Sequence, residues 1–344
     1  MKIKILERKM HIQMTLLKNL GEPEIIHLLQ AYIDSSGIGG IEDAYLCNYT
    51  DPHLLVNVDT MSKNSDFLPQ QTWNQIGAKL VVITFSDLGA KGAEPKQFLS
   101  SLVLESTMEE ADLRELVESI QKTSHNYNAT YLGGDLGSSS EAVLTGVGLG
   151  SISEGKILSR GDAQKGDLVC VTGYFGLTSI GFDYLLSPTS RKFDNVPENL
   201  LNRAVQLLYE PQPRISEGIL LSKHDLATAS IDSSDGLAIS LHWLSQASNL
   251  GIVINNLPID PELNQIIDSQ EIIKEVTLFG GEEYELVFTI PPTKKEELQE
   301  LFRKSKLQFH VIGECIASKG VFISTNDILM PVQMRGWDTF RKMV

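Results

Sequence analysis

Six aspartates lie where apolar runs break into glycine or serine, a pattern that could bind a metal ion. They are Asp43 in GGIEDA, Asp59 in VNVDT, Asp87 in FSDLGAKGA, Asp135 in YLGGDL, and Asp232 and Asp235 in SIDSSDGL. Carboxylates at strand ends beside glycine can converge on a hard cation, and magnesium readily bridges such oxygens to phosphate. The chain has no P-loop with its lysine. We therefore expect metal bridges between these carboxylates and a polyphosphate.

Composition indicates an ordinary globular protein of two domains, because 344 residues are enough for two separate cores. Hydrophobic residues make up 42% of the chain and charged residues 21%. The formal net charge of −15 argues against binding nucleic acid through the surface. The acidic surface by itself is best explained by solubility. An anionic substrate would need that charge to be offset locally by metal ions.

The cysteines Cys47, Cys170 and Cys315 lie far apart, without the CxxC spacing of a zinc site. They suggest buried thiols in a reducing compartment, and we expect a cytoplasmic protein. No apolar stretch approaches the roughly 20 residues of a membrane span. The basic start MKIKILERKM lacks the apolar segment of a signal peptide and is predicted to be a short extension, residues 1–13.

Alternating short apolar runs and helical patterns predict α/β or α+β architecture, with mixed sheets and helices on one face. Helical spacing covers Leu16 to Tyr32, and Met108 to Lys122 is an amphipathic helix with acidic residues early and a lysine at its end. The runs LLVNVDT, KLVVITFSD and QFLSSLVLES are predicted to be strands, or a helix leading into a strand. A boundary near residues 151–160 divides the chain into an N-terminal domain, 14–153, and a C-terminal domain, 154–344.

The segment SIDSSDGLA reads as a strand that turns into a helix, with Asp232 ending the strand. Serine and aspartate are also good helix N-caps, so capping alone could explain Ser234 or Asp235. The segment GGEEYELVFT, in which two glycines and two glutamates lead into an apolar strand, is harder to explain by local structure.

Taken together, these segments resemble the thiamine-monophosphate kinases, within the superfamily of aminoimidazole ribonucleotide synthetase. The resemblance runs from about Leu16 to Phe340. Its motifs occur in the family's order: GGIEDA, VDT with DFLP, FSDLGAKGA, YLGGD, SRGDAQKGD, VTGYFG, EPQPRI, IDSSDGL, GGEEYELVFT and RGWDTF. Each motif is weak alone, but ten in sequence leave little room for coincidence.

The resemblance implies direct transfer of the ATP γ-phosphate onto thiamine monophosphate, without a covalent phosphoenzyme. In such a reaction the protein mainly positions the reactants and neutralises charge, which several magnesium ions would help to do. It also implies an N-terminal mixed sheet that closes a barrel with a second copy in a homodimer, and a larger C-terminal α+β domain. The apolar strands around Leu54–Val58 and Leu99–Leu104 are candidates for that interface or for internal core.

The family's site residues carry over onto matching positions of this chain. The six aspartates correspond to magnesium ligands. Gly134, Asp135, Arg160 and Ser234 correspond to ATP contacts, Gly134 because glycine lets a backbone approach a phosphate and Arg160 because guanidinium binds phosphate well. Glu282 and Trp337 correspond to substrate contacts, and an indole could stack on a cationic thiazolium. Trp337 could equally be an ordinary core aromatic.

Departures from the family pattern cluster on the acceptor side. Asp66 stands at a substrate-contacting position where the family has histidine, and an aspartate there would repel a phosphate. The other departures are Glu42 for aspartate, Asn57-Val58 for Ser-Thr, Leu136 for threonine and Lys91 for methionine. A related kinase with a different acceptor, or a catalytically weak nucleotide-binding homologue, is therefore the alternative. Selenophosphate synthetase and the hydrogenase-maturation relative are disfavoured because the cysteines that they need are missing, and aminoimidazole ribonucleotide synthetase because GGEEYEL and RGWDTF fit it poorly.

Overall fold

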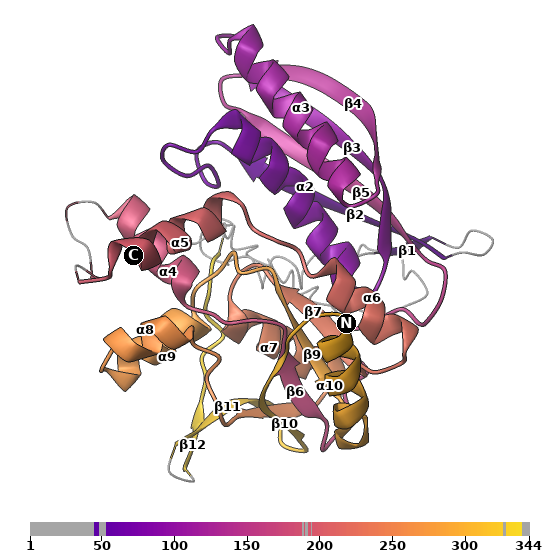
Figure 1. Ribbon diagram of the computed structural model, residues 1–344, viewed down its shortest axis with the longest axis vertical. Coiled ribbons are helices and arrows are strands. Elements are labelled where there is room, and N and C mark those ends of the chain that lie inside the picture. The colour runs from indigo at the N-terminus through magenta and orange to yellow at the C-terminus, as the bar shows by residue number, and fades with distance from the viewer. Residues whose placement is uncertain are drawn as a thin grey trace, which may run out of the picture. The chain divides into compact units, whose positions relative to one another are not determined.

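The computed structural model describes residues 45–47, 53–187, 189, 192–193, 195–325 and 328–338. The helices and strands described below belong to one compact unit, Ser35–Trp337, which contains two sheets (Figure 1). Asp43, the extension 1–13 and the helix expected at Leu16 to Tyr32 lie outside the described residues.

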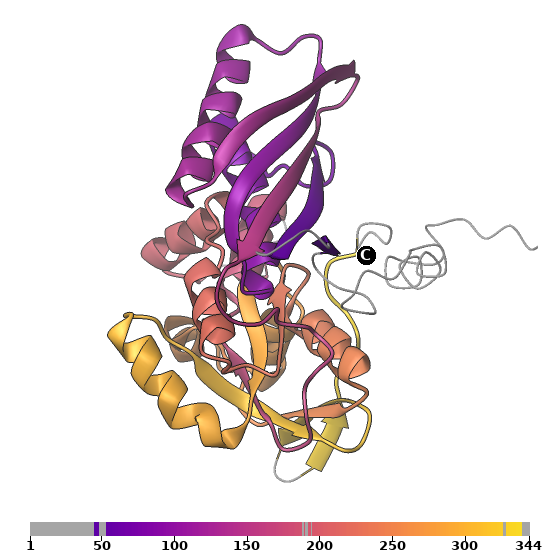
Figure 2. The same ribbon diagram turned by 90° about the vertical axis from the view of Figure 1, so that its right-hand side faces the viewer.

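The first sheet is five-stranded and mixed, with strand order β1-β2-β5-β3-β4 and a parallel pair only between β3 and β4. Helices α2 and α3 pack together over one of its faces (Figures 1 and 2). The mixed sheet with helices on one face confirms the expectation from the sequence. The elements are β1 (Tyr45–Cys47), β2 (His53–Ser62), α2 (Trp73–Ala90), β3 (Glu94–Glu105), α3 (Glu110–Asn126), β4 (Thr130–Ser139) and β5 (Val143–Ile152).

Helix α2 contains the run KLVVITFSD, for which the sequence left strand and helix open. It begins with a capping box, in which Thr72 and Gln75 satisfy each other's backbone N–H groups. The helix is apolar almost all round because it packs on β2, β3 and β5 and also against α3, α6 and β7. Such a helix lacks the polar face that would have identified it by periodicity. Asp87 therefore lies in a helix, and the expectation that it ends a strand is wrong.

Asp59 and Asp135 do not lie at strand ends either. Asp59 lies within β2 and Asp135 lies within β4. The predicted amphipathic helix is α3, which begins at Glu110 with acidic residues in its first turn, as expected. It continues to Asn126, so the lysine expected at its end lies inside the helix and His125 occupies the last turn.

The second sheet is seven-stranded, with order β12-β11-β8-β10-β6-β9-β7. Helices α4, α5, α8 and α9 share one apolar cluster, while α6 and α10 pack with β6 and β9 in another (Figure 1). The elements are β6 (Leu168–Val171), α4 (Leu177–Leu186), α5 (Glu198–Tyr209), α6 (Ile215–Lys223), β7 (Ala229–Ser233), α7 (Leu237–Ser248), β8 (Gly251–Ile254), α8 (Pro261–Ile266), α9 (Gln270–Leu278), β9 (Glu285–Ile290), the 3₁₀ helix η3 (Pro292–Lys294), α10 (Lys295–Lys304), β10 (His310–Ile316), β11 (Gly320–Thr325) and β12 (Ile328–Pro331).

The junction between β7 and α7 has the strand, turn and helix that the sequence predicted. The residue at the N-cap position of α7 is Gly236, and no side chain caps this helix. Capping therefore does not explain Ser234 or Asp235.

The two candidate interface strands divide their residues between the faces of the first sheet. Leu55 on β2 and Leu102 on β3 are buried in the core beneath the helices. Val58 is 59% exposed and aligns through Val147 of β5 with Leu99 of β3. Internal core is thus confirmed for alternate residues of these strands, and the interface stays a prediction for the residues on the other face.

Cys170 and Cys315 are buried free thiols, as expected. None of the helices in the described ranges is both long and apolar enough to cross a membrane. Strand β5 ends at Ile152 and β6 begins at Leu168, so the predicted division at 153/154 falls between the sheets; the domain limits themselves stay a prediction.

Substituting Gly134 should destabilise the first sheet. A Cβ at Gly134 would lie 1.7 Å from the Ser100 carbonyl oxygen, beside a bulge in the β3–β4 pairing, and φ is +155°. We expect Gly134→Ala to lower the free energy of unfolding by about 2–3 kcal/mol. Gly133→Ala is the matched control, since it also has positive φ but has nothing within 4 Å of its Cβ. It should cost only about 1 kcal/mol. Equal losses in urea titrations of the two variants would contradict this explanation.

Candidate functional site

Three of the predicted aspartates gather where α2 packs against both sheets. Asp59 comes from β2, Asp87 from α2 and Asp232 from β7. Burial, together with the charge of Asp232, raises the pKa of Asp59 to about 6. Burial and the charges of Asp59 and Asp232 raise the pKa of Asp87 well above its usual range. These groups are thus close enough to oppose one another's ionisation.

Asn57 holds two of these carboxylates together. Its side-chain amide nitrogen donates to Oδ2 of Asp59 and Oδ2 of Asp87, both at 3.0 Å, and to the Thr84 carbonyl at 2.8 Å. Asn57 is one of the residues at which the sequence departs from the pattern of the family that it resembles. The amide offers no positive charge, so it orients the two carboxylates without neutralising them.

Asp232 has a different environment. Burial raises its pKa, whereas a 2.7 Å hydrogen bond from the Ser86 hydroxyl and the charges of Arg160 and Lys91 act to lower it. Lys91 is fully buried and donates to the Ser230 carbonyl at 3.2 Å. The protein therefore supplies cations near Asp232, whereas the pKa values of Asp59 and Asp87 are raised by neighbouring carboxylates.

Backbone hydrogen bonds join three of the predicted motifs at the turn between β7 and α7. The Glu282 N–H donates to the Ser234 carbonyl at 2.6 Å, and the Tyr284 N–H donates to Ser233 at 2.9 Å. The Trp337 N–H donates to the Asp235 carbonyl at 2.9 Å. The structure therefore brings together four site residues predicted from distant parts of the sequence: Ser234, Asp235, Glu282 and Trp337.

The Glu282 side chain is held by a buried lysine that the sequence reasoning did not identify. Lys79 of α2 is 1% exposed, and its ammonium lies 2.7 Å from both Oε1 and Oε2 of Glu282. Tyr284 links this side to the carboxylates: burial, followed by the charges of Glu282, Asp59, Asp235 and Asp232, raises its pKa well above the usual range. The phenol therefore stays protonated beside both groups.

Three of the other predicted residues lie in settings that the sequence did not foresee. Asp135 is exposed on the edge strand β4, three strands from Asp59 and thus roughly 14 Å away across the sheet. Gly134 has a structural requirement within the sheet, because a Cβ there would meet the Ser100 backbone, and its contact with ATP stays a prediction. Asp66 Oδ2 accepts from the Ser62 N–H at 2.7 Å and from the Ser65 hydroxyl at 2.5 Å, so it stabilises its own turn.

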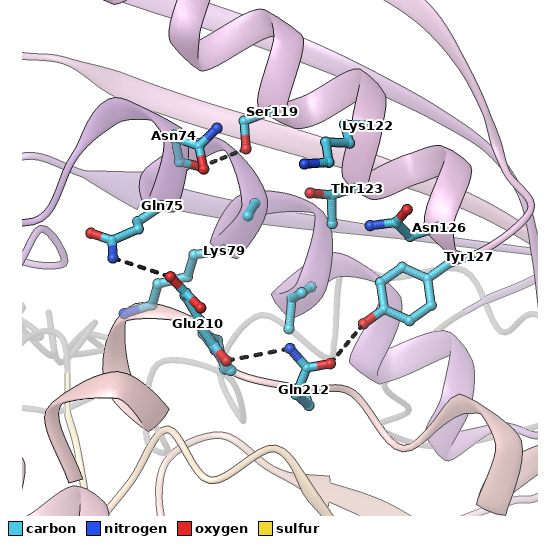
Figure 3. A pocket seen from close by; sticks show the side chains of 13 residues that line it. Asn74, Gln75, Lys79, Ser119, Lys122, Thr123, Asn126, Tyr127, Glu210 and Gln212 are labelled. Atoms are coloured by element: carbon cyan, nitrogen blue, oxygen red, sulfur yellow. Dashed lines mark hydrogen bonds between the residues drawn. The ribbon is translucent and has the colours of Figure 1, made fainter. Parts of the chain in front are cut away.

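A separate polar cleft of about 460 Å³ lies between α2, α3 and the segment around residues 210–212 (Figure 3). Lys122 and Asn126 line it from α3, Tyr127 lines it directly after that helix, and Gln212 lines it from the facing segment. None of the predicted site residues lines this cleft, but the stem of Lys79 does. Lys79 therefore connects the cleft wall to Glu282.

A divalent cation needs several oxygen ligands arranged around it. In the part of the chain that the structure describes, no three or more histidine, cysteine, aspartate or glutamate side chains are arranged to hold a metal ion by themselves. Asp59 and Asp87 nevertheless offer half-buried oxygen ligands, whose pKa values are raised by burial and by the charges of neighbouring carboxylates. Magnesium commonly binds through one or two protein carboxylates together with substrate phosphates. The residues fit a site completed by a nucleotide better than a preformed cage.

Comparison with known proteins identifies related sequences and structures. Residues 41–152 match the N-terminal domain of the AIR synthase related proteins, and residues 164–326 match their C-terminal domain. The thiamine-monophosphate kinase of Pyrococcus horikoshii is 32% identical over 92% of this chain and 95% of its own. That of Pyrococcus abyssi is 32% identical over 93% and 96%. The solved structure of AaThiL complexed with AMPPCP and TMP superposes with a TM-score of 0.81 at 28% identity, covering 95% and 99% of the two chains.

Lys79 and Tyr284 are the functional candidates that sequence reasoning missed. Lys79 interrupts an otherwise apolar run in IGAKLVVITF, and a lone lysine in a buried helix requires a charged partner. The sequence therefore contains a signal for Lys79. It contains none for Tyr284, because the position of Tyr284 depends on backbone hydrogen bonds between two loops.

Replacing Asp87 with asparagine should separate charge repulsion from metal binding. In EDTA, loss of a carboxyl group whose ionisation is opposed by Asp59 and Asp232 should raise the melting temperature by about 2 °C or more, while the stabilisation by magnesium with ATP should largely disappear. Asp135→Asn, at an exposed position, should leave the melting temperature in EDTA unchanged within about 1 °C. Thermal melts with and without magnesium and ATP measure both effects. A destabilised Asp87→Asn that keeps the full response to magnesium would refute the role given to Asp87.

Proposed function

Because the chain belongs to the thiamine-monophosphate kinase family, built from the two AIR synthase-related domains, we propose that it transfers the γ-phosphate of ATP to thiamine monophosphate. The products are thiamine diphosphate and ADP. AaThiL, a relative of known structure, is complexed with AMPPCP and TMP, which supports this pair of substrates. The observation that carries the proposal is the joining of Ser234, Asp235, Glu282 and Trp337 by backbone bonds.

The nucleotide side of the site would use the cluster of Asp59, Asp87 and Asp232. Asp59, Asp87 and Asp232, which lie together, would hold magnesium, and Asp43, Asp135 and Asp235 are proposed from the family pattern alone. Magnesium, when bound, supplies the positive charge that lets two phosphates approach each other. Gly134, Asp135, Arg160 and Ser234 are proposed to contact ATP. The transfer is direct, and no side chain of the chain carries the phosphoryl group.

The acceptor side would use Glu282 and Trp337. Glu282 offers carboxylate oxygens to a nitrogen-rich ring, and the half-buried Trp337 offers a face to a cationic one. Asp66, also predicted to contact substrate, favours the second candidate function, a kinase with another acceptor. Its carboxylate accepts hydrogen bonds within its own turn and offers no positive charge to an acceptor phosphate.

We also propose that the chain is a homodimer and acts in the cytoplasm. In the described ranges α2 and α3 cover one face of the first sheet (Figure 2). Val58, Val147 and Leu99 form an apolar row on the other face. A second copy would cover this row. The buried free thiols Cys170 and Cys315 suit a reducing compartment.

Purified protein should phosphorylate thiamine monophosphate with ATP and magnesium, and thiamine should not serve as acceptor. Because Asp66 offers no positive charge, we expect a high KM for thiamine monophosphate. Asp66→His should lower this KM by roughly 10-fold or more, as one charge-assisted contact is worth about 1.5–3 kcal/mol. Asp66→Asn is the control that removes the charge without adding an imidazole. If thiamine monophosphate neither binds nor accepts phosphate in wild type or Asp66→His, the acceptor is another molecule.

The dimer can be tested by placing a charge in the apolar row. Wild-type protein should be dimeric by light scattering at micromolar concentration, and Val147→Lys should be monomeric because the ammonium would be buried without a partner. Ile328→Lys is the matched control, since Ile328 is 65% exposed on β12 of the other sheet. A monomeric wild type would contradict the proposed interface.

A further inference from the structure

Lys79 occupies a costly position for a charged side chain. It lies inside the buried helix α2 between Ala78 and Leu80, and its side chain is 2% exposed. A buried ammonium is strongly destabilising unless a negative group faces it. Its contact with Glu282 supplies that group, and the equal 2.7 Å distances to both carboxylate oxygens show a symmetric pair.

Glu282 is fixed from its backbone as well as from its side chain. Its φ of +61° and the φ of +53° at Tyr284 are left-handed values, which are costly for residues other than glycine. The hydrogen bonds to Ser233 and Ser234 hold both residues in place. The Glu282 side chain is still 21% exposed, so a ligand can reach it.

This pairing changes what Glu282 can offer a ligand. A carboxylate with an ammonium across both oxygens has little net charge left, but each oxygen keeps a lone pair that can accept another hydrogen bond. Glu282 is therefore suited to recognise N–H donors in a fixed direction, more than to attract a cation. The 4-aminopyrimidine of a thiamine phosphate carries such donors.

We propose that Lys79 is a positioning residue for the acceptor, holding the Glu282 carboxylate in the orientation that accepts hydrogen bonds from the acceptor's amine-bearing ring. The inference rests on the proposed function, because it takes thiamine monophosphate as the acceptor. Lys79 acts from α2, at the wall of the polar cleft, and its ammonium points away from the α3 residues Ser119, Lys122 and Thr123 (Figure 3). It does not touch the transferred phosphate in this role.

Lys79→Met tests the proposal, because methionine keeps an unbranched stem and removes the charge. We expect the KM for thiamine monophosphate to rise about 10-fold or more, with kcat within about threefold and the KM for ATP unchanged. Glu282→Gln alone should also raise the KM, and adding it to Lys79→Met should change the KM by less than twofold. Lys294→Met is the control, since it breaks an exposed 2.9 Å pair with Glu297 and should leave every constant unchanged.

A KM for thiamine monophosphate within twofold of wild type in Lys79→Met overturns the proposal. Equal increases in both KM values would show a general structural role and overturn it as well. If Lys79→Met does not fold, Lys79→Met/Glu282→Gln replaces it, since this variant leaves no buried charge unpaired. That double variant should have the KM of Glu282→Gln, and a wild-type KM would overturn the proposal.

Failure of the proposed function gives a different result. If wild-type protein does not phosphorylate thiamine monophosphate, the kinase assignment is wrong, and the role of Lys79 is measured from binding by calorimetry. An unchanged Kd for thiamine monophosphate in Lys79→Met then overturns this inference alone. Absence of any binding to wild type overturns both.

Discussion

The repulsion among buried carboxylates is the constraint on which the rest of the site depends. Asp59, Asp87 and Asp232 cannot all be charged in a buried space without positive charge nearby. Arg160 and Lys91 act on Asp232, whereas Asp59 and Asp87 share the neutral amide of Asn57. This asymmetry leaves the pair of Asp59 and Asp87 as the part of the site that most requires an external cation. A nucleotide that arrives with its cation would satisfy this pair.

Helix α2 sets the spacing between the two sides of the site. Asp87 belongs to the cluster of Asp59, Asp87 and Asp232, and Lys79 holds the acceptor-side Glu282. They are eight residues apart, which is roughly 12 Å along a helix axis. Because α2 is buried between the two sheets, this separation is rigid. The helix also contributes Ser86, which donates to Asp232 of the second sheet, so three separate contacts of the site depend on one element.

The sequence predicted the elements that have a clear period and the residues that belong to ordered motifs. Strands β2, β3 and β7, and helix α3, were expected within a few residues of their observed positions. Helix α2 was ambiguous because burial on all sides removes the polar face that distinguishes a helix from a strand. The pairing of Lys79 with Glu282 joins residues 203 positions apart, and no local pattern specifies such a contact. Asn57 was noted only as a departure, since its role depends on Asp87 lying opposite it.

Two residues that depart from the family pattern, Asn57 and Asp66, have local structural roles. Asn57 replaces a hydroxyl but fixes two carboxylates, and Asp66 replaces a histidine but stabilises its own turn. Neither substitution disturbs the junction at which the loops of Asp235 and Glu282 meet. That junction contains left-handed residues, Glu282 and Tyr284, whose strain is offset by backbone hydrogen bonds. Because these bonds form within the protein itself, the acceptor side is organised before any ligand binds, and less of the binding free energy is spent on ordering it.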